Sequence, residues 1–160
     1  MQGERQPAEV PALISYAVEA IKPSSEGREQ TVHTQVSTAL EPVLVDADMV
    51  RRVLINLLEN AAKYTPVGGN LVIGAEIGPE IKDGFLRLYV QDNGPGIPES
   101  DREHIFEKFI RLKNKTGMRG MGVGLAFCRL AVLGHGGNIW VEPASPGGSK
   151  FIFTLPLAKE

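Results

Sequence analysis

Apolar residues follow two different spacings along the chain, and each spacing predicts a different kind of element. Between Asp46 and Pro66 the apolar positions recur every three or four residues, as on one face of an α-helix. Asp46 suits the N-cap, Asp48 places a favourable charge in the first turn, and Pro66 ends the run. The buried face of this helix would consist of Val50, Val53, Leu54, Leu57, Leu58 and Ala61.

The rest of the chain alternates between helical and strand-like patterns. Helices are expected at about Val10–Ile21, Ala47–Tyr64, Asp101–Phe106 and Val123–Leu133. Strands are expected at Gln30–Thr38, Val43–Val45, Leu71–Ile77, Phe85–Gln91, Asn138–Glu142 and Lys150–Pro156, with hairpin turns at Lys82–Gly84 and Ser145–Gly148. This mixture predicts an α+β fold, a two-layer sandwich in which a mixed, mostly antiparallel sheet is covered on one face by helices.

A second, polar stripe runs along the helix predicted at Ala47–Tyr64. Asn56, Asn60 and Lys63 are spaced by four and three residues, which places them roughly 130° from the centre of the apolar face. Asparagine is a mediocre helix former, so two of them are poor choices for a plainly solvated surface. The two interpretations are a solvated face and a flank that offers two amides and an ammonium group to a ligand.

The segment Asp92-Asn-Gly-Pro-Gly-Ile-Pro98 places a carboxylate at the end of the strand predicted at Phe85–Gln91. Gly94 and Gly96 let the backbone approach a flat ligand with no Cβ in the way. An adenine base suits Asp92 because its exocyclic amine donates a hydrogen bond. Guanine presents an oxygen there and leaves the carboxylate unpaired, at a cost of roughly 1–3 kcal/mol. A plain surface turn is the competing interpretation of so short a motif.

Three further glycines, Gly120, Gly122 and Gly124, precede or open the helix predicted at Val123–Leu133. A glycine-rich entry to a helix offers free N–H groups and the positive end of the helix dipole to a phosphate. The cluster lacks the Gly-Lys-Ser/Thr of a Walker loop and the strand-first context of a dinucleotide fingerprint. A flexible loop is the alternative interpretation.

Composition narrows the class of protein. A chain of 160 residues is long enough for one domain with its own core. The formal net charge of −2 gives no basic surface for nucleic acid, and no apolar run reaches membrane-spanning length. The single cysteine, Cys128, rules out an internal disulfide and a cysteine-cluster metal site, and is expected in the core. No secretory signal is visible, so a cytoplasmic module is expected, whose parent protein could still be anchored in a membrane.

The order of these motifs is more specific than any one of them. The chain resembles the catalytic ATP-binding domain of sensor histidine kinases, within the superfamily of gyrase, heat-shock chaperone, histidine kinase and mismatch-repair ATPases. The resemblance runs from about Val10 to Pro156 and includes a Gly-Gly-Ser before a terminal Phe-x-Phe-Thr-Leu-Pro strand. It implies the same two-layer sandwich, the Bergerat ATP-binding fold. The N, G1, F and G2 boxes of the family correspond to Asn56–Pro66, Asp92–Ile97, Ile105–Phe109 and Gly120–Gly124.

The resemblance implies roles for the polar stripe. Asn60 would coordinate the Mg²⁺ that bridges the nucleotide phosphates, since an amide oxygen suits a hard cation. Asn56 would face the phosphate–metal region one turn earlier, where hydrolysing relatives place a glutamate that activates water. An amide cannot act as a general base, so the site would hold ATP for another nucleophile. Lys63 would contact phosphate oxygens, and Tyr64 would flank the ribose or the adenine.

At the base end, the resemblance implies that Asp92 accepts from the adenine amine, beside Gly94 and Gly96. Ser149 stands where the family commonly has a threonine that helps to hold the base, and it keeps the hydroxyl. Ile97 and Leu125 would pack near the base, with simple core packing equally open. The phosphates would meet the glycine-rich entry formed by Gly120, Gly122 and Gly124.

Between Phe109 and Gly120 the chain carries four basic residues and no acidic one. The resemblance implies that this segment is a lid over the triphosphate. Arg111 is the expected γ-phosphate contact, whereas the other three basic residues are as readily explained as solvated. Phe106 and Phe109 would anchor the lid to the body of the domain.

No histidine lies in the Ser-His-Glu-Leu-Arg-like context that the family uses as phosphoacceptor, so His33, His104 and His135 are interpreted as structural or surface residues. The chain would therefore be the catalytic half only. Residues 1–9 would be a disordered end of a longer parent or an added segment, and residues 10–157 the ATP-binding domain. The expected partners are the dimerisation and phosphoacceptor helical hairpin of the parent kinase and, indirectly, a response regulator. Without that hairpin, a monomer is expected.

Three functions remain open. The first is transfer of the γ-phosphoryl group of Mg-ATP to a histidine on a separate domain, in two-component signal transduction. The second is ATP hydrolysis, or serine phosphorylation of an anti-sigma partner, by a relative in the same superfamily; Asn56 argues against the ATPase. The third is a nucleotide-binding regulatory module without catalysis, whose expected sign would be loss of Asn60, Asp92 or the glycines, all of which are present.

Overall fold

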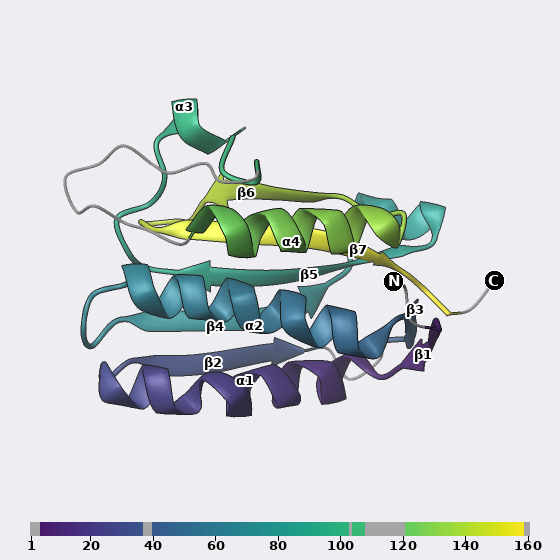
Figure 1. Ribbon diagram of the computed structural model, residues 1–160, viewed down its shortest axis with the longest axis horizontal. Helices are drawn as coiled ribbons and strands as arrows, with labels where there is room; N and C mark the ends of the chain where they lie inside the picture. The colour runs from purple at the N-terminus through teal and green to yellow at the C-terminus, as the bar shows by residue number, and fades with distance from the viewer. Residues whose placement is uncertain (1–3, 37–39, 103, 108–120, 159–160) are drawn as a thin grey trace.

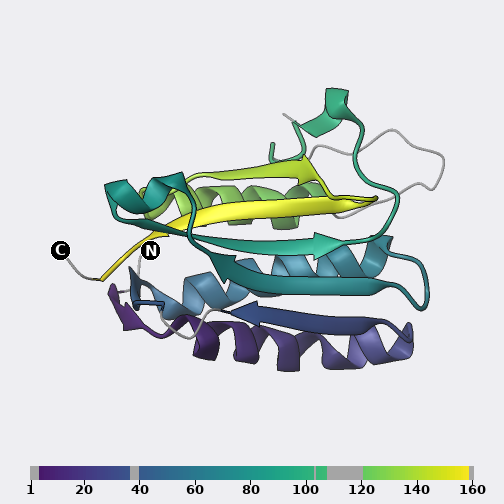
Figure 2. The ribbon, with the colours of Figure 1, turned by 180° about the vertical axis from the view of Figure 1, so that it is seen from behind.

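Five strands form one sheet in the spatial order β2-β4-β5-β7-β6, and three long helices lie across one of its faces (Figure 1). This computed structural model describes residues 4–36, 40–102, 104–107 and 121–158. Seen from behind, the strands stand in front of the helices, so the other face of the sheet turns away from them (Figure 2). The strands are β2 (Thr31–Val36), β4 (Asn70–Glu76), β5 (Phe85–Asp92), β6 (Ile139–Pro143) and β7 (Ser149–Pro156), and the helices are α1 (Val10–Gly27), α2 (Ala47–Tyr64) and α4 (Met121–Gly134).

Most strand pairs in this sheet are antiparallel. Only β2 and β4 run parallel among the described pairs, while β5 pairs antiparallel with β4 and β7, and β7 with β6. The predicted fold class, a mixed and mostly antiparallel sheet with helices on one face, is therefore confirmed. The predicted turns lie between β4 and β5 and between β6 and β7; the first also contains a short 3-10 helix, η1 (Pro79–Asp83). The last predicted residues of the first sheet strand, 37 and 38, lie outside the described residues.

Helix α2 forms where its apolar spacing predicts it. The Asp46 carboxylate accepts a hydrogen bond from the Met49 N–H at 3.3 Å, which caps the first turn. Every residue of the predicted apolar stripe is buried in the core, and full burial of one such side chain stabilises the fold by about 1.5–3 kcal/mol. On the sheet side, alternate residues of β5 complete this core: Leu86, Leu88 and Val90.

Helix α1 is longer than the sequence pattern predicts. It continues through Pro23 and ends at Gly27, whereas the expected end was about Ile21. Proline removes one backbone N–H from the helix but leaves the following residues free to resume the ladder. Ile21 and Ser25 are both buried, so packing on either side of the proline holds the extra turn in place.

The N-terminus is also more ordered than expected. Gln6–Ala8 form a short strand, β1, that pairs antiparallel with β3 (Val43–Val45), and the Arg5 guanidinium donates to the Gly134 carbonyl oxygen. The prediction that residues 1–9 are disordered is therefore wrong for Gln6–Ala8. The composition of this segment hides the strand because β1 pairs through its backbone, and backbone pairing needs no apolar side chains.

The short helix before the F box begins earlier than predicted. Helix α3 covers Glu99–Arg102, directly after Pro98, and the residues expected to end it form a turn instead. That turn is fixed to the core, because Ile105 is fully buried and the Phe106 ring packs edge-on against Phe151 at 6.0 Å between centroids. The predicted anchoring role of Phe106 agrees with this contact; Phe109 lies outside the described residues.

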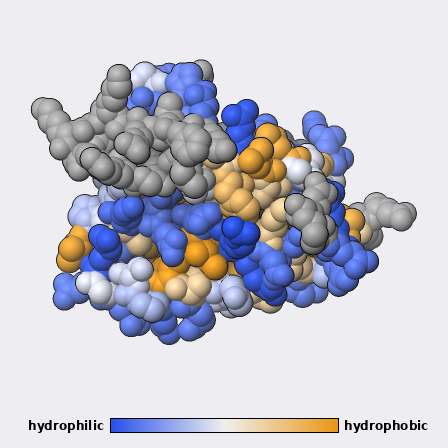
Figure 3. Space-filling model, viewed as in Figure 1, coloured by the Kyte–Doolittle hydropathy of each residue, from blue (hydrophilic) through white to orange (hydrophobic). Residues whose placement is uncertain are grey.

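The solvent side of the helices carries an apolar patch over α4 (Figure 3), where Leu130 and Leu133 are exposed. Elsewhere on this side, basic residues cover aromatic rings: Arg51 lies 4.9 Å from the Tyr16 ring centroid. Among the described helices, none combines the length and apolar character that a membrane crossing requires.

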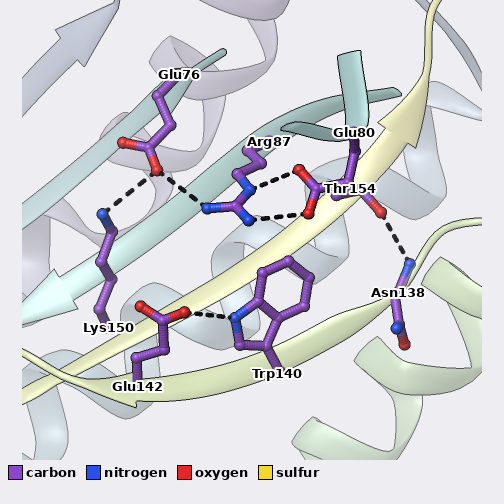
Figure 4. A network of polar contacts seen from close by, with 8 residues as sticks. All are labelled: Glu76, Glu80, Arg87, Asn138, Trp140, Glu142, Lys150 and Thr154. Atoms are coloured by element: carbon purple, nitrogen blue, oxygen red, sulfur yellow. Dashed lines mark hydrogen bonds and ion pairs between the residues drawn. The ribbon is translucent and has the colours of Figure 1, made fainter. Parts of the chain in front are cut away.

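The sheet face that turns away from the helices is covered by a polar network (Figure 4). The Arg87 guanidinium donates to both carboxylate oxygens of Glu80, at 2.7 and 2.9 Å, and lies 5.1 Å from the centroid of the Trp140 ring. The Glu76 carboxylate forms ion pairs with Arg87 and Lys150, with N···O distances of 3.8 and 3.4 Å. The network shields the strand side chains beneath it, such as Ile152, which is fully buried on this face.

Replacing Glu80 with Gln tests this network through its pH dependence. The Arg87 hydrogen bond holds the pKa of Glu80 below its usual value of 4.5, so the pair stabilises the fold above that pH. This contribution is lost as the pH falls through the lowered pKa of the folded state. At pH 7 we expect Glu80→Gln to reduce the free energy of unfolding by about 0.5–1 kcal/mol, measured by urea titration.

The difference between wild type and Glu80→Gln should shrink as the pH falls from 4.5 through the lowered pKa of folded Glu80, because the carboxylate is progressively protonated. Glu26→Gln, an exposed change on α1, is the matched control and should show no such pH dependence. An equal deficit at pH 7 and pH 3 would show that the Glu80–Arg87 charge pair is not the stabilising interaction.

Candidate functional site

A cavity of about 580 Å³ lies at the end of the sheet where β5 stops and β7 starts. One wall comes from the last turns of α2, the floor from Asp92 and Phe151, and the opposite wall from α3 and the turn between β6 and β7. Its volume falls in the range of pockets that hold small-molecule ligands and cofactors. The lining residues are Asn60, Ala61, Tyr64, Asp92, Pro95, Gly96, Ile97, Pro98, Arg102, Pro143, Ala144, Pro146, Gly147, Gly148, Ser149 and Phe151.

The Asp92 carboxylate is held by backbone groups from both sides. Its Oδ1 accepts from the Gly94 N–H at 2.9 Å and from the Ser149 N–H at 3.3 Å. Burial raises the pKa of Asp92, and these two hydrogen bonds oppose that rise by favouring the ionised form. No described residue donates to Oδ2, so this oxygen can accept a hydrogen bond from a ligand.

Two glycines make this close packing possible. Gly96 and Gly148 have φ values of 84° and 103°, in the left-handed region that side chains other than glycine rarely adopt. A Cβ at Gly148 would lie 2.0 Å from the Asp92 carbonyl oxygen, which is impossible without moving the backbone. The turn between β6 and β7 therefore reaches Asp92 only because residue 148 is glycine.

Helix α2 supplies the polar wall of the cavity. Asn60 and Tyr64 line the cavity, one helical turn apart, while Lys63 is exposed with its Nζ 5.8 Å from the centroid of the Tyr64 ring. The Asn60 Nδ2 is buried and has no hydrogen-bond partner among the described residues. A buried amide with an unpaired group is costly, which indicates that a ligand completes its hydrogen bonding.

Asn56 faces helix α4 and is not among the cavity-lining residues. A Cβ added at Gly124 would lie 3.8 Å from its Cγ, and its side chain hydrogen-bonds with the Cys128 thiol. That thiol also donates to the Val53 carbonyl oxygen at 3.7 Å, and burial raises the pKa of Cys128 to about 12. Cys128 is therefore a protonated core residue, as predicted from its position in the helix.

The structure brings together most of the residues predicted for the base end. Ile97 and Ser149 line the cavity beside Asp92, but Ser149 reaches the carboxylate through its backbone N–H. Leu125 is fully buried in the hydrophobic core and is not among the cavity-lining residues. Of the two interpretations of Leu125, the structure favours core packing.

Part of the predicted phosphate end lies outside the described residues. This applies to Arg111 and Gly120 and to the rest of the segment predicted as a lid. Gly122 and Gly124 belong to the first turn of α4, so the glycine-rich segment does lead into a helix N-terminus. The roles assigned to these residues stay predictions.

The histidines lie away from the cavity. His33 and His104 are on the surface, near Asn70 and Glu107 respectively. His135 is buried between two helices, with Nε2 accepting from the Asp46 N–H at 3.0 Å and Nδ1 2.7 Å from the Ala131 carbonyl oxygen. This arrangement suits a tautomer with its proton on Nδ1, and both contacts agree with the predicted structural role.

The sequence patterns missed several cavity residues. The sequence predicted a turn at Ser145–Gly148 and a strand that includes Phe151, but it did not predict that these residues line a binding cavity. Arg102 lines the cavity from α3 and belongs to no motif of the chain. The turn and Phe151 reach the cavity through the pairing of β5, β6 and β7, and Arg102 reaches it through the packing of α3; a linear pattern encodes neither.

The combined lining defines what the cavity can bind. Prolines, alanines, Ile97 and Phe151 make a largely apolar slot, and Asp92 is the one carboxylate among the described residues that line it. Flat rings prefer such apolar slots, and a carboxylate acceptor selects a ring that carries an amine. The cavity therefore fits an amine-bearing base, with a polar exit along α2.

Comparisons with known proteins agree with this geometry. Residues 45–159 match the family model described as histidine kinase-, DNA gyrase B-, and HSP90-like ATPase. The adaptive-response sensory kinase SasA of Synechococcus sp. (strain JA-2-3B'a(2-13)) is 40% identical over 149 residues, 93% of this chain and 39% of the relative. SasA of Microcystis aeruginosa (strain NIES-843 / IAM M-2473) is 45% identical over 118 residues, 74% of this chain and 30% of the relative. The chain thus spans less than half the length of these relatives.

Solved structures show the same fold. The catalytic domain of histidine kinase ThkA, in a nucleotide-free form, superposes with a TM-score of 0.83 at 29% identity and covers 97% of this chain and 99% of that domain. The mycobacterial sensor histidine kinase MprB gives 0.80 at 31% identity, over 95% of this chain and 98% of its own. The family match, the fold and the Asp92 cavity lead to one conclusion: this chain belongs to the histidine kinase-, DNA gyrase B- and HSP90-like ATPase family, as the ATP-binding catalytic domain found in sensor histidine kinases.

Proposed function

We propose that this chain binds Mg-ATP and donates its γ-phosphoryl group to a histidine on a separate dimerisation and phosphoacceptor domain. The observation that carries the proposal is the Asp92 carboxylate in the apolar cavity, with Oδ1 fixed by two backbone N–H groups and Oδ2 available to a ligand. In this proposal the adenine amine donates to Oδ2. Guanine would place an oxygen opposite the same acceptor, so adenine nucleotides are preferred.

The triphosphate would extend from the base along α2 towards the start of α4. Lys63 supplies a positive charge on this path, and Asn60 supplies an amide next to the cavity. A Cβ at Gly124 would make only an ordinary contact with Asn56, so packing within the described protein does not itself require glycine there. A phosphate close to the first turn of α4 would supply the reason for it.

Asn60 fits a magnesium site. Its amide borders the cavity, and amide oxygens are suitable ligands for Mg²⁺. Its Nδ2, which lacks a partner in the described part of the chain, is a donor and would suit a phosphate oxygen instead. Bound Mg²⁺ would neutralise charge on the nucleotide phosphates. In the proposal Asn60 holds the ion, Lys63 contacts phosphate oxygens, and Arg111, which lies outside the described residues, contacts the γ-phosphate.

The described site supports transfer to an external acceptor more than hydrolysis. Asn56 is an amide and its neighbour Cys128 is a protonated thiol, so neither can activate a water molecule. Asp92 is held in the base end of the cavity, and no described histidine lines that cavity. The nucleophile in this proposal therefore comes from a partner.

The neighbours in structure indicate what such a partner can be. ShkA, solved at full length in complex with AMPPNP, superposes on the whole of this chain with a TM-score of 0.85 at 27% identity, and the match covers 32% of ShkA. ThkA has been solved in complex with the response regulator protein TrrA. We propose the helical hairpin of a parent kinase as the direct partner and a response regulator as the indirect one, with this fragment monomeric and cytoplasmic.

An ATPase remains the second candidate, because hydrolysing members share the family. A nucleotide-binding regulatory module without catalysis is the third candidate. In the first function the γ-phosphate passes to a histidine, in the second it is released to water, and in the third it stays on the nucleotide.

Asp92→Asn tests the adenine contact. The Asn Oδ1 can still accept from Gly94 and Ser149, but its Nδ2 would place a donor against the donating amine of the base. We expect ATP affinity, measured by calorimetry, to fall by about ten- to a hundredfold, corresponding to roughly 1–3 kcal/mol. Asp83→Asn, at the opposite end of β5, is the matched control and should bind as wild type.

The same variant should fold at least as well as wild type. Burial raises the pKa of Asp92, so the ionised carboxylate costs stability above the unfolded-state pKa, and that cost disappears at low pH. Asp92→Asn removes the charge, and its thermal midpoint at pH 7 should equal or exceed that of wild type. Unchanged ATP affinity would remove the adenine assignment.

Asn60→Ala tests the magnesium assignment. We expect ATP binding without Mg²⁺ to change little, and the gain in affinity on adding Mg²⁺ to shrink by about tenfold, or roughly 1.4 kcal/mol. Glu59→Ala, an exposed neighbour on the same helix, controls for the change in helix propensity. A Mg²⁺ titration that is the same for wild type and Asn60→Ala would take this residue away from the metal.

The function itself is tested by mixing the chain with γ-labelled ATP and a supplied acceptor hairpin from a two-component kinase. We expect label on the hairpin histidine, detected as an acid-labile phosphoprotein, and very slow phosphate release when the hairpin is omitted. At an ATP concentration near the wild-type Kd, Asp92→Asn should transfer much less label, in proportion to its lower affinity. Rapid phosphate release without the hairpin would instead indicate an ATPase, and ATP binding with neither reaction would indicate a regulatory module.

A further inference from the structure

Arg102 enters the cavity from a side that no motif of the chain marks. It is the last residue of α3 and lines the cavity opposite the α2 wall. Its Nε donates to the Ile97 carbonyl oxygen at 3.1 Å. Ile97 belongs to the turn at residues 94–98. The first residue of this turn, Gly94, donates its N–H to the Asp92 carboxylate. One guanidinium thus connects α3 to the turn that borders the base end of the cavity.

The position of Arg102 is fixed from behind. The Asp101 N–H donates to the Pro98 carbonyl oxygen at 2.9 Å, and the Ile105 N–H donates to the Asp101 carbonyl oxygen at 3.1 Å. Ile105 is fully buried, so α3 cannot move away from the turn without exposing a core residue. A side chain anchored in this way can set the position of a loop, because its own location is set by the core.

The charge of Arg102 has no acidic partner among the residues that the structure describes. In the described ranges of the chain, no carboxylate lies within ion-pair distance of its guanidinium. Arg87 and Arg51, by contrast, each pair with an acid. Among the described residues, no ion pair accounts for Arg102, and the hydrogen bond that its guanidinium makes there is to the cavity turn.

We propose that Arg102 is a positioning residue for the base of the bound nucleotide: its guanidinium holds the turn at residues 94–98 against the base end of the cavity through the Ile97 carbonyl oxygen. The inference rests on the ATP-binding function proposed above. Turn and base meet on the Asp92 side, whereas the polar exit lies along α2. Loss of Arg102 therefore weakens the grip on the base and leaves the phosphate contacts unchanged.

The test separates the two parts of the nucleotide. Arg102→Met keeps most of the side-chain stem but removes every donor, and Arg102→Gln serves as a second variant with a shorter polar side chain. Binding of adenosine and of inorganic tripolyphosphate to the full chain is measured by amide chemical-shift titration at 0.15 M salt. We expect both variants to bind adenosine roughly five- to tenfold more weakly than wild type, as for loss of one hydrogen bond, with tripolyphosphate affinity unchanged within twofold.

Lys82→Met is the control for removal of one positive charge, since Lys82 is exposed at the far end of the sheet. It should bind both ligands as wild type does, because exposed charges at such a distance are screened. Thermal midpoints without ligand should agree among all four proteins. Those values establish that any lost affinity does not come from partial unfolding.

Two outcomes would overturn the inference. Unchanged adenosine affinity in Arg102→Met and Arg102→Gln would show that the turn does not need Arg102. An equal loss for adenosine and tripolyphosphate would show that Arg102 acts on the phosphates or on the whole domain. Failure of wild type to bind either adenosine or ATP would be a different result, because it would remove the proposed function itself.

Discussion

Two backbone N–H groups, one from Gly94 and one from Ser149, converge on a single oxygen of Asp92. This interaction ties together the end of β5, the turn that follows it and the start of β7. It also determines which oxygen of the carboxylate is left for a ligand. Since the approach of the second turn depends on a glycine at 148, the sheet edge, the two turns and the cavity form one unit.

The Asp92 carboxylate lowers the stability of the empty domain in a way that a bound ligand would reverse. Burial raises the pKa of Asp92, so keeping it ionised at neutral pH costs the empty domain part of its stability. A donating amine in the cavity would offset that cost, and the offset would appear as binding affinity. The Nδ2 of Asn60, on the neighbouring wall, is buried without a partner among the described residues, and a ligand that accepts its hydrogen bond would likewise offset the cost of its burial. Both groups are expensive in the free protein and useful only when a ligand is bound.

Helix α2 has an apolar stripe that packs in the core and a polar stripe that carries the candidate site residues. Its apolar stripe fixes the helix on the sheet, and its polar stripe presents Asn56, Asn60 and Lys63 along one flank. The first of these turns to α4 and touches a protonated thiol, while the second turns to the cavity. Neither amide can remove a proton from water, so the two asparagines of this stripe provide no base for hydrolysis.

Local patterns were sufficient wherever one element carries its own signal. The apolar period of α2, the acid and glycines after β5 and the turn before β7 are short-range features. They gave the fold class correctly, and the structure brings most of the residues predicted for the base end together at one cavity. Three features depended on contacts between distant segments: the strand β1 pairs through its backbone, α1 continues past Pro23 because the residues around it are buried, and Arg102 reaches the cavity only once α3 is anchored by Ile105. Backbone pairing and burial by remote residues leave no periodic trace in the chain, so only the assembled sheet and its turns could reveal them.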